Sequence, residues 1–520
     1  MKQVINKITI VVMLFSIMLT SCTKDFQEMN TDPNNLPNAL PQQLLAPALV
    51  STLTYNMLRN RNFNNELMQV TVNMTDAEGQ VFRYDYRSSF ADYLYNGLYS
   101  ELTNFKDIYK IASDTSSVNF NRSYMGISLI CQSWMYSILT DTYGDIPYFQ
   151  SIQGKDSLNF QPAFDPQKDI YLDIFKRLEE ANELLTFNTS ISAGSDPVYG
   201  GNISNWRKFG NSLYLRLLLR ISGKAEVAPM VIAKIKEIVD EKPSTYPIMA
   251  NNNESAILRW TGIAPYTSPY LNVREQDFRA PGIASFFIDN LVNWNDPRID
   301  VATFGTSNGT TTINRWGIAP FMGVFAGVPS GYAPGANPDK KSYFYSNTSH
   351  KSLQTEPLTG MMMNYAELNF ILAEAALKGW ISNSAETYYK EGVLNGITLW
   401  IPTWTTTINP GTGRVNNVDD YLIAADKQFL LNQTFDERME RIHLMKYYAL
   451  FLVDLQQWFE YRRTGKPTLP KGSGLRNNGI MPARMTYPVY VQSTNRDNYQ
   501  AAIARQGPDL ISTLVWWQKP

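Results

Sequence analysis

The sequence predicts an all-α protein, a superhelix of helix pairs packed in the manner of tetratricopeptide repeats. Three observations support this prediction. Apolar residues recur three to four positions apart through most of the chain. The segments with this spacing form pairs of similar length, and small residues such as Ala373, Ala375 and Ala376 accompany large ones within them. The strict repeat consensus is absent, so the prediction rests on the layout of the pairs.

The N-terminal segment predicts export from the cytoplasm. Lys2 and Lys7 give a cationic start, residues 8–19 form an almost unbroken apolar run, and Thr20 and Ser21 are small. The run is shorter than the roughly 20 residues that a membrane-spanning helix needs. We therefore interpret residues 1–21 as a signal that is removed on export.

Cys22 follows this signal directly, and Leu19-Thr20-Ser21-Cys22 resembles the lipobox of bacterial lipoproteins. The resemblance implies cleavage before Cys22, a diacylglyceryl thioether on its sulfur and an acylated amino group. Several acyl chains hold a protein firmly at a membrane, whereas one chain is marginal. The alternative is an ordinary secretory signal with an incidental cysteine. Residues 22–40 contain polar turn formers and are predicted to be a lipid-anchored tether.

Residues 41–520 are predicted to form one helical domain, because no Gly/Ser linker, charge block or change of composition divides them. The segments with helical spacing are 41–74, 90–112, 122–140, 166–185, 203–221, 227–239, 362–379, 384–399 and 436–463. Gly144 and Pro147 follow the third of these and terminate it. Asp165 is predicted to cap the fourth and Asp436 the last, which Gly465 closes.

Residues 250–345 differ from the rest of the chain. They are rich in Asn, Gly, Pro, Thr and aromatic residues, with little helical spacing apart from about 282–294. Irregular segments of this length inside a compact protein are usually functional. We therefore expect the ligand-bearing surface of the protein in this region.

The composition excludes some functions. Lys plus Arg number 46 and Asp plus Glu 47, so no basic excess indicates a nucleic-acid partner. Charged residues make up 18% of the chain, against about 25% in an average soluble domain. Aromatic residues reach 13%, which suits stacking against neutral ligands. The chain has no His/Cys metal spacing and no phosphate loop, so no metal or cofactor is predicted, and Cys131 is expected to be a buried hydrophobe.

A neutral ring-shaped ligand such as a sugar is bound by flat apolar faces on its C–H side and by polar groups at its hydroxyls. Two stretches offer aromatic side chains beside polar ones on predicted loops. In the first, spacing by two in an extended segment would place two tyrosines on one side. The candidates are Arg83, Tyr84 and Tyr86 in that stretch, and Tyr266, Tyr270, Trp316, Tyr332, Tyr343 and Tyr345 in the irregular region. The alternative for each ring is that it covers the helical core; for Trp260 and Trp294 packing is the better interpretation.

No catalytic residue is predicted. Glu367 and Glu374 lie seven apart on one helix face, and two carboxylates could serve a glycosidase. Lys378, however, follows Glu374 by four positions, as in a solvated ion pair. His443 stands alone on an apolar helix and is interpreted as a core residue.

Six segments together resemble SusD/RagB-type outer-membrane nutrient-binding lipoproteins, especially the divergent SusD-like branch. They occur in the family's order along nearly the whole chain. The segments are the lipobox with KDF at 24–26, NTDPN at 30–34, YGDIPY at 143–148, NYAEL at 364–368 running into LAEA at 372–375, WFEYRRTGKP at 458–467, and MPAR at 481–484 before Tyr487-Pro488. One departure is Gln492, which stands in the area where such proteins usually have a glutamate.

The resemblance implies a superhelix with four tetratricopeptide-like units and a SusC-like TonB-dependent transporter as partner. The shared motifs themselves are interpreted as structural, with Arg462 and Arg463 pairing with acids or carbonyls between helices. The sequence thus favours a surface-facing outer-membrane lipoprotein that delivers an oligosaccharide to the transporter. Three alternatives remain open: a peptide-binding subunit, a surface glycosidase, and a structural lid without a ligand of its own.

Overall fold

The computed structural model of the protein describes residues 39–75, 79–301, 306–307, 311–348, 351–409 and 411–520. All the elements considered below belong to one compact unit, Pro41–Pro520. The predicted signal 1–21, the lipidation of Cys22 and nearly all of the tether 22–40 lie outside the described residues. Within them, no helix combines the length and the apolar character required to cross a membrane.

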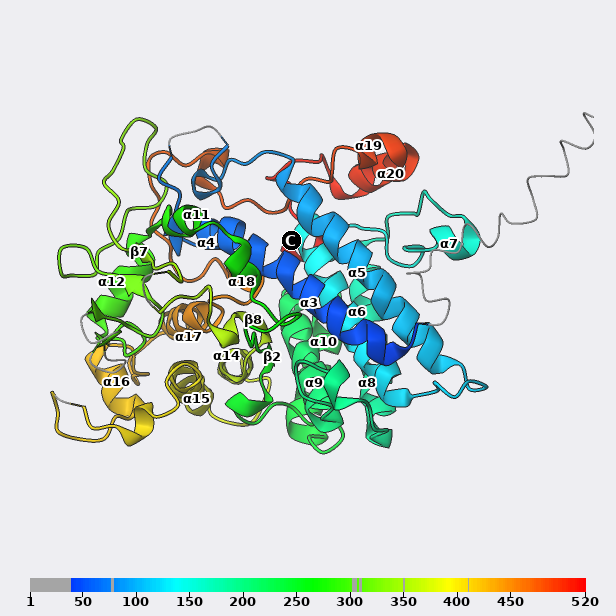
Figure 1. Cartoon of the computed structure of the whole chain (residues 1–520), viewed down its shortest axis with the longest axis horizontal. Helices are drawn as coiled ribbons and strands as arrows, with labels where there is room; N and C mark the ends of the chain where they lie inside the picture. The colour runs from blue at the N-terminus through cyan, green and yellow to red at the C-terminus, as the bar shows by residue number, and fades with distance from the viewer. Residues whose placement is uncertain (1–38, 76–78, 302–305, 308–310, 349–350, 410) are drawn as a thin grey trace, which may run out of the picture. The chain divides into compact units, whose positions relative to one another are not determined.

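The first part of the unit is a succession of long helices, each packed on the next (Figure 1). α3 contacts α5, α5 contacts α6, α6 contacts α8, α8 contacts α9, and α9 contacts α10. The bounds are α3 (Pro41–Arg59), α5 (Phe90–Ser113), α6 (Arg122–Tyr143), α8 (Gln167–Leu184), α9 (Ile203–Ile221) and α10 (Ala228–Lys236). Gly97 of α5 allows a close approach to α3, because a Cβ there would overlap the ring of Tyr55. This layered arrangement confirms the predicted all-α fold.

A second group of helices forms the other end of the unit. α14 (Tyr365–Leu377) packs on α15 (Ala385–Thr398), on α17 (Phe435–Ala449) and on α9. α16 (Val418–Ala424) contacts α15, and α18 (Gln456–Thr464) follows α17. Short helices complete the set: α4 (Asn65–Leu67), α7 (Gly154–Ser157), α11 (Glu275–Arg279), α12 (Ser285–Asn293), α19 (Val491–Thr494) and α20 (Arg496–Gln506).

Short antiparallel strand pairs, each with at least one strand in the irregular region, were not predicted from the sequence. β1 (Thr71–Val72) pairs with β3 (Gly282–Ile283), and β2 (Ala256–Leu258) pairs with β8 (Gly360–Met363). β4 (Thr306–Ser307) pairs with β5 (Thr311–Thr312), and β6 (Ile318–Ala319) with β7 (Tyr343–Phe344). Two to four residues are too few for the alternation of apolar and polar residues to stand out from the surrounding sequence.

Two predicted helices are wrong, one in where it ends and the other in being continuous. The segment 41–74 is helical only to Leu67, with a π-helical turn at Asn60–Asn64, and then becomes β1. The segment 436–463 consists of α17 and α18, because the chain turns between them. Leu452 and Asp454 there have φ angles of 71° and 26°, which no helix continues through.

Two predicted caps are also wrong. Asp145, and not Asp165, accepts the N–H of Gln167 at the start of α8, at 2.9 Å. Asp165 instead accepts the N–H groups of Tyr148 and Phe149. Thr434, and not Asp436, caps α17, where it forms a reciprocal capping box with Glu437.

Candidate functional site

The first predicted stretch is not an extended loop. Val81–Arg83 form a 3-10 turn, and Tyr84 has a φ of 61°. The guanidinium of Arg83 lies over the ring of Tyr332, and its Nε donates to the Tyr332 carbonyl oxygen at 3.0 Å. Tyr86 donates its hydroxyl to the Arg484 carbonyl oxygen at 2.6 Å. These contacts bury Arg83, Tyr84 and Tyr86, so the structure gives them packing roles.

Three further candidates also lie in the core. Trp316 is completely buried, with its ring against Phe287, Phe451 and Trp400. Tyr270 is 2% exposed and Tyr332 9% exposed, so neither presents a ring face to a ligand. Trp260 and Trp294, interpreted as packing residues, are buried as expected.

Tyr266, Tyr343 and Tyr345 remain accessible, each half-buried. Tyr343 and Tyr345 lie together, with ring centroids 5.9 Å apart at 75°. β7 explains their placement: successive side chains of an extended segment point to opposite faces, so residues two apart share a face. Accordingly Ser342, Phe344 and Ser346 are buried, whereas the two tyrosines between them face outward.

Two cations flank these rings and complete a surface that we call the tyrosine platform, formed by Arg279, Lys340, Tyr343 and Tyr345. Arg279 of α11 donates to the Tyr343 hydroxyl at 3.1 Å, and its guanidinium carbon lies 5.2 Å from the ring centroid. The Lys340 ammonium lies 4.3 Å from the same centroid and donates to the Arg279 carbonyl oxygen at 2.6 Å. The Tyr343 ring is therefore held in a fixed orientation.

A carboxylate lies at the edge of the platform. Glu275 accepts hydrogen bonds from Arg279 at 3.2 Å and from the Ser346 hydroxyl at 3.0 Å. Hydrogen bonds from Thr348 and Ser346 lower the pKa of Glu275, so it is an ionised acceptor at neutral pH. Aromatic faces, donors and an acceptor thus lie on one surface, which is the combination that a sugar ring needs.

The sequence reasoning missed Glu275, Arg279 and Lys340. The signal for Tyr343 and Tyr345 was their residue type, aromatic side chains on a predicted loop. Arg279 and Lys340 carry no such signal, because β7 and α11 meet only in the folded chain.

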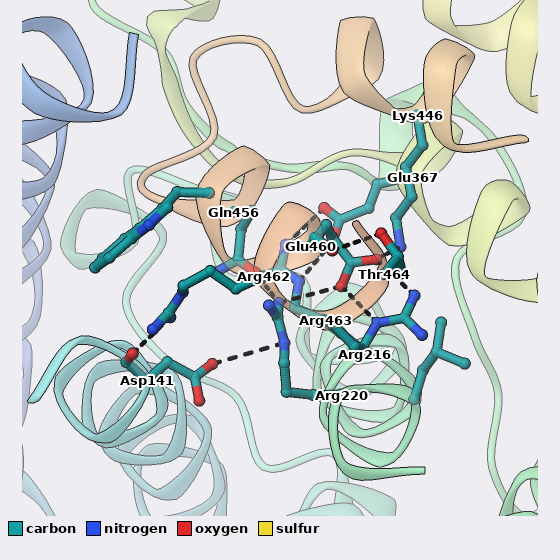
Figure 2. Close-up of polar contacts among 12 residues, drawn as sticks. Asp141, Arg216, Arg220, Glu367, Lys446, Gln456, Glu460, Arg462, Arg463 and Thr464 are labelled. Atoms are coloured by element: carbon teal, nitrogen blue, oxygen red, sulfur yellow. Dashed lines mark hydrogen bonds and ion pairs between the residues drawn. The ribbon is translucent and has the colours of Figure 1, made fainter. Parts of the chain in front are cut away.

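The carboxylates considered for catalysis belong instead to a buried charge cluster around α18, and Figure 2 shows the part of it that contains Glu367. Arg216 of α9 binds Glu367 through two hydrogen bonds of 2.6 Å. Arg463 of α18 binds Glu374 through hydrogen bonds of 2.8 and 2.5 Å. Glu374 and its bond to Lys378 were predicted to be solvated, which is wrong: the Glu374 side chain is 0% exposed.

Both arginines of the WFEYRRTGKP motif bind as predicted. Arg463 also donates to Glu460 at 2.8 Å. Arg462 donates to the Ala483 carbonyl oxygen and, at 2.6 Å, to that of Asp141 on α6. The motif therefore joins α18 to neighbouring helices and does not contribute to the platform.

Glu374, His443 and Glu460 bring possible metal-ligand atoms within 4.8 Å of one another. Arg463 already binds both carboxylates, and Lys446 binds Glu460 at 2.7 Å. Burial lowers the pKa of His443 to about 3 although Glu374 opposes the shift, so the imidazole is neutral. A metal ion would have to displace two cations here. The group is therefore a set of closed ion pairs and not a metal centre.

The helical layers and the tyrosine platform define a protein of packed helices with an exposed aromatic surface. Residues 33–488 match the SusD-like family described as starch-binding and associating with the outer membrane. The chain belongs to this SusD-like family. No curated protein matches it.

Solved structures agree with this assignment. A SusD homologue from Bacteroides fragilis is 25% identical, with a TM-score of 0.72, and the match covers 93% of this chain and 100% of that one. A chitin-binding SusD homologue from Flavobacterium johnsoniae is 20% identical, with a TM-score of 0.74 and coverage of 92% and 98%. A SusD homologue from Bacteroides thetaiotaomicron is 19% identical, with a TM-score of 0.70 and coverage of 93% and 100%.

Proposed function

We propose that this protein is a lipid-anchored, surface-facing outer-membrane protein that binds an oligosaccharide on the tyrosine platform. It passes the ligand to a SusC-like TonB-dependent transporter and performs no chemistry on it. The observation that carries the proposal is the pairing of two accessible tyrosine rings with Arg279 and Lys340.

The physical properties of the platform support a neutral glycan. The two half-buried tyrosines offer apolar ring surface for the C–H side of a sugar. The two rings are inclined, so they suit a bent chain rather than a flat one. Arg279 and Lys340 supply donors for hydroxyl groups, and Glu275 supplies an acceptor.

The family supports the location and the ligand class. Its description names starch and the outer membrane, and the Flavobacterium relative is a chitin-binding protein. The lipobox ending at Cys22 supplies the anchor in this proposal. Glu367 and Glu374, the two carboxylates considered for glycosidase catalysis, are each bound by an arginine, which supports a protein without catalytic activity.

The test is calorimetric titration of the soluble protein, lacking residues 1–22, with maltoheptaose, chitohexaose and peptide pools. Saturable binding of an oligosaccharide without product formation is expected. Tyr343→Ala and Tyr345→Ala should each weaken it by about 1 to 2 kcal/mol, a loss comparable to one stacking partner.

Tyr388→Ala is the matched control, because Tyr388 is a half-buried tyrosine on α15. It should bind like the unmodified protein. Binding of peptides alone would replace the glycan with a peptide ligand. Hydrolysis of any oligosaccharide would show that the protein is an enzyme.

A further inference from the structure

A second concave site lies between α5, the loop 147–164 that contains α7, and α19 (Figure 1). Its volume is about 420 Å³, within the range of roughly 300 to 1,000 Å³ that small-molecule sites occupy. We call it the α5–α19 cavity, and it shares no residue with the tyrosine platform. Tyr95 and Phe164 are among the residues that line it, but both are buried and neither is counted as ligand-facing.

Hydrogen bonds join the three walls of the cavity in pairs. A side chain of α5 donates to the loop, a side chain of the loop donates to α19, and the residue that begins α19 donates to α5. The bonds run from Tyr99 to the Pro147 carbonyl oxygen at 2.6 Å, from Gln161 to the Thr494 carbonyl oxygen at 3.0 Å, and from Tyr490 to Asn96 Oδ1 at 2.5 Å. The walls are therefore held in place before any ligand arrives, which lowers the entropic cost of binding.

Two aromatic rings at this cavity are open to solvent. Phe160 is 74% exposed and Tyr490 is 44% exposed, and Tyr99, which lines the same cavity, is half-buried. Gly154 of α7 gives Phe160 a surface to pack on, because a Cβ there would lie only 3.1 Å from the Phe160 ring. The ring therefore rests on the glycine and keeps most of its surface available to a ligand, unlike the buried aromatic candidates described above.

The cavity offers hydrogen-bonding groups but no formal charge, because none of the described residues that line it is acidic or basic. Asn96 is exposed, and its amide nitrogen has no hydrogen-bond partner among the described residues, while its Oδ1 accepts from Tyr490. Ser100, one turn further along α5, is exposed as well. These donors favour a ligand with acceptor oxygens over a purely apolar one. A carboxylate ligand would lose water here without gaining a counter-charge.

We infer that the α5–α19 cavity is a second saccharide-binding site, which takes a neutral sugar unit and discriminates against uronic acids. Phe160 and Tyr490 supply the apolar ring surface, and Asn96 supplies a donor for a sugar oxygen. The inference rests on the proposed function for its ligand class, but it concerns separate residues. A glycan that engages both sites would bind more tightly than at either site alone.

The test replaces Phe160 alone by 4-fluorophenylalanine through amber suppression, in the soluble protein that lacks residues 1–22. A single fluorine resonance then reports on the cavity. Maltoheptaose, chitohexaose and hexagalacturonate are titrated to millimolar concentration. At least one neutral oligosaccharide should shift the resonance saturably, and hexagalacturonate should not. Tyr343→Ala should leave the dissociation constant read from this shift unchanged, because Tyr343 does not line the cavity.

Asn96→Asp distinguishes the ligand contact from the hydrogen bonds between the walls. It removes the amide donor but keeps an acceptor for Tyr490. It should raise the dissociation constant about tenfold, which corresponds to the loss of one hydrogen bond to the ligand. Asn253→Asp is the matched control, because it makes the same change of charge at an exposed asparagine outside the cavity. Thermal unfolding of each variant shows that it is folded.

The outcomes separate the two proposals. If platform variants weaken calorimetric binding but no neutral oligosaccharide shifts the resonance at position 160, the cavity is refuted and the proposed function stands. If the resonance shifts while platform variants bind normally, the platform is refuted and the cavity stands. A dissociation constant that Asn96→Asp leaves unchanged would overturn the assignment of the donor. Equal shifts with neutral and acidic oligosaccharides would overturn the selectivity.

Discussion

Replacing Arg216 by methionine should destabilise the protein strongly, because it leaves a buried carboxylate without its partner. Arg216 makes two hydrogen bonds of 2.6 Å to Glu367 and one of 2.9 Å to the Met362 carbonyl oxygen. The two side chains are 2% and 1% exposed. Water therefore cannot replace the lost guanidinium. Breaking one partner of such a pair costs about 3 to 5 kcal/mol, and the orphaned carbonyl adds about 1 kcal/mol.

The double variant Arg216→Met/Glu367→Met distinguishes the cost of an unpaired charge from the cost of lost packing. Removing both charges is often nearly neutral, so the double variant should recover to within about 2 kcal/mol of the unmodified protein. The measurement is urea unfolding, followed by far-ultraviolet circular dichroism and tryptophan fluorescence, with coincident transitions as the criterion for two-state analysis. A double variant as unstable as Arg216→Met alone would refute the reasoning.

Three further predictions concern stability. Burial raises the pKa of Glu66 to about 8, although a hydrogen bond from the Phe82 backbone opposes the shift. The contribution of Glu66 to the free energy of unfolding is therefore complete below the pKa of the unfolded chain, near 4.5, and is lost as the pH rises through 8. Glu66→Gln should therefore be more stable than the unmodified protein at pH 9 by roughly 3 to 5 kcal/mol but not at pH 5. The same difference in melting temperature between the two proteins at both pH values would contradict this. Gly144 has a φ of 85° and a Cβ there would overlap Gln506, so Gly144→Ala should lower the melting temperature, with a cost of about 2 kcal/mol or more, whereas Gly223→Ala, which has open space, should not. Thr434→Ala should lower the free energy of unfolding by about 1 kcal/mol and Asp436→Ala almost not at all, because only the threonine caps α17. Equal losses for the two variants in chemical denaturation would show that Thr434 is not the cap.

The interiors of the helices could be predicted from the sequence, but several ends could not. Apolar spacing continues from α17 into α18, so nothing local marks the turn between them. The turn is fixed from elsewhere: the Asp454 carbonyl oxygen accepts from Asn60 at 2.7 Å, across 394 positions of sequence. The cap of α8 fails for a related reason, because Asp145 reaches Gln167 from the end of the preceding long helix.

Only part of the candidate site could be predicted from the sequence. The residue type of an aromatic side chain does not say which of its faces is covered. Trp316 and Tyr345 come from the same irregular region, yet Phe287 and Phe451 enclose the tryptophan while the tyrosine stays half-exposed. The structural role of Arg462 and Arg463 was predictable from the motif. The burial of Glu374, the partner of Arg463, was not, because it depends on helices α17 and α18 packing near α14.

The buried charge cluster also limits how far this protein behaves as a set of repeats. In open helical arrays each repeat contacts only its neighbours, so repeats can be removed or added and unfolding can proceed piece by piece. Here Asp141 on α6 accepts a hydrogen bond from Trp517, and Arg220 on α9 donates to Gln456 on α18. Arg220 also pairs with Asp141 on α6 and with Glu460 on α18, so excising α6, α9 or α18 would leave a charge on another of these helices without a partner. The helices are arranged like those of a repeat protein, but their buried polar contacts make them fold and unfold as one unit. Evolution or engineering can therefore vary the loops far more readily than the number of helix pairs.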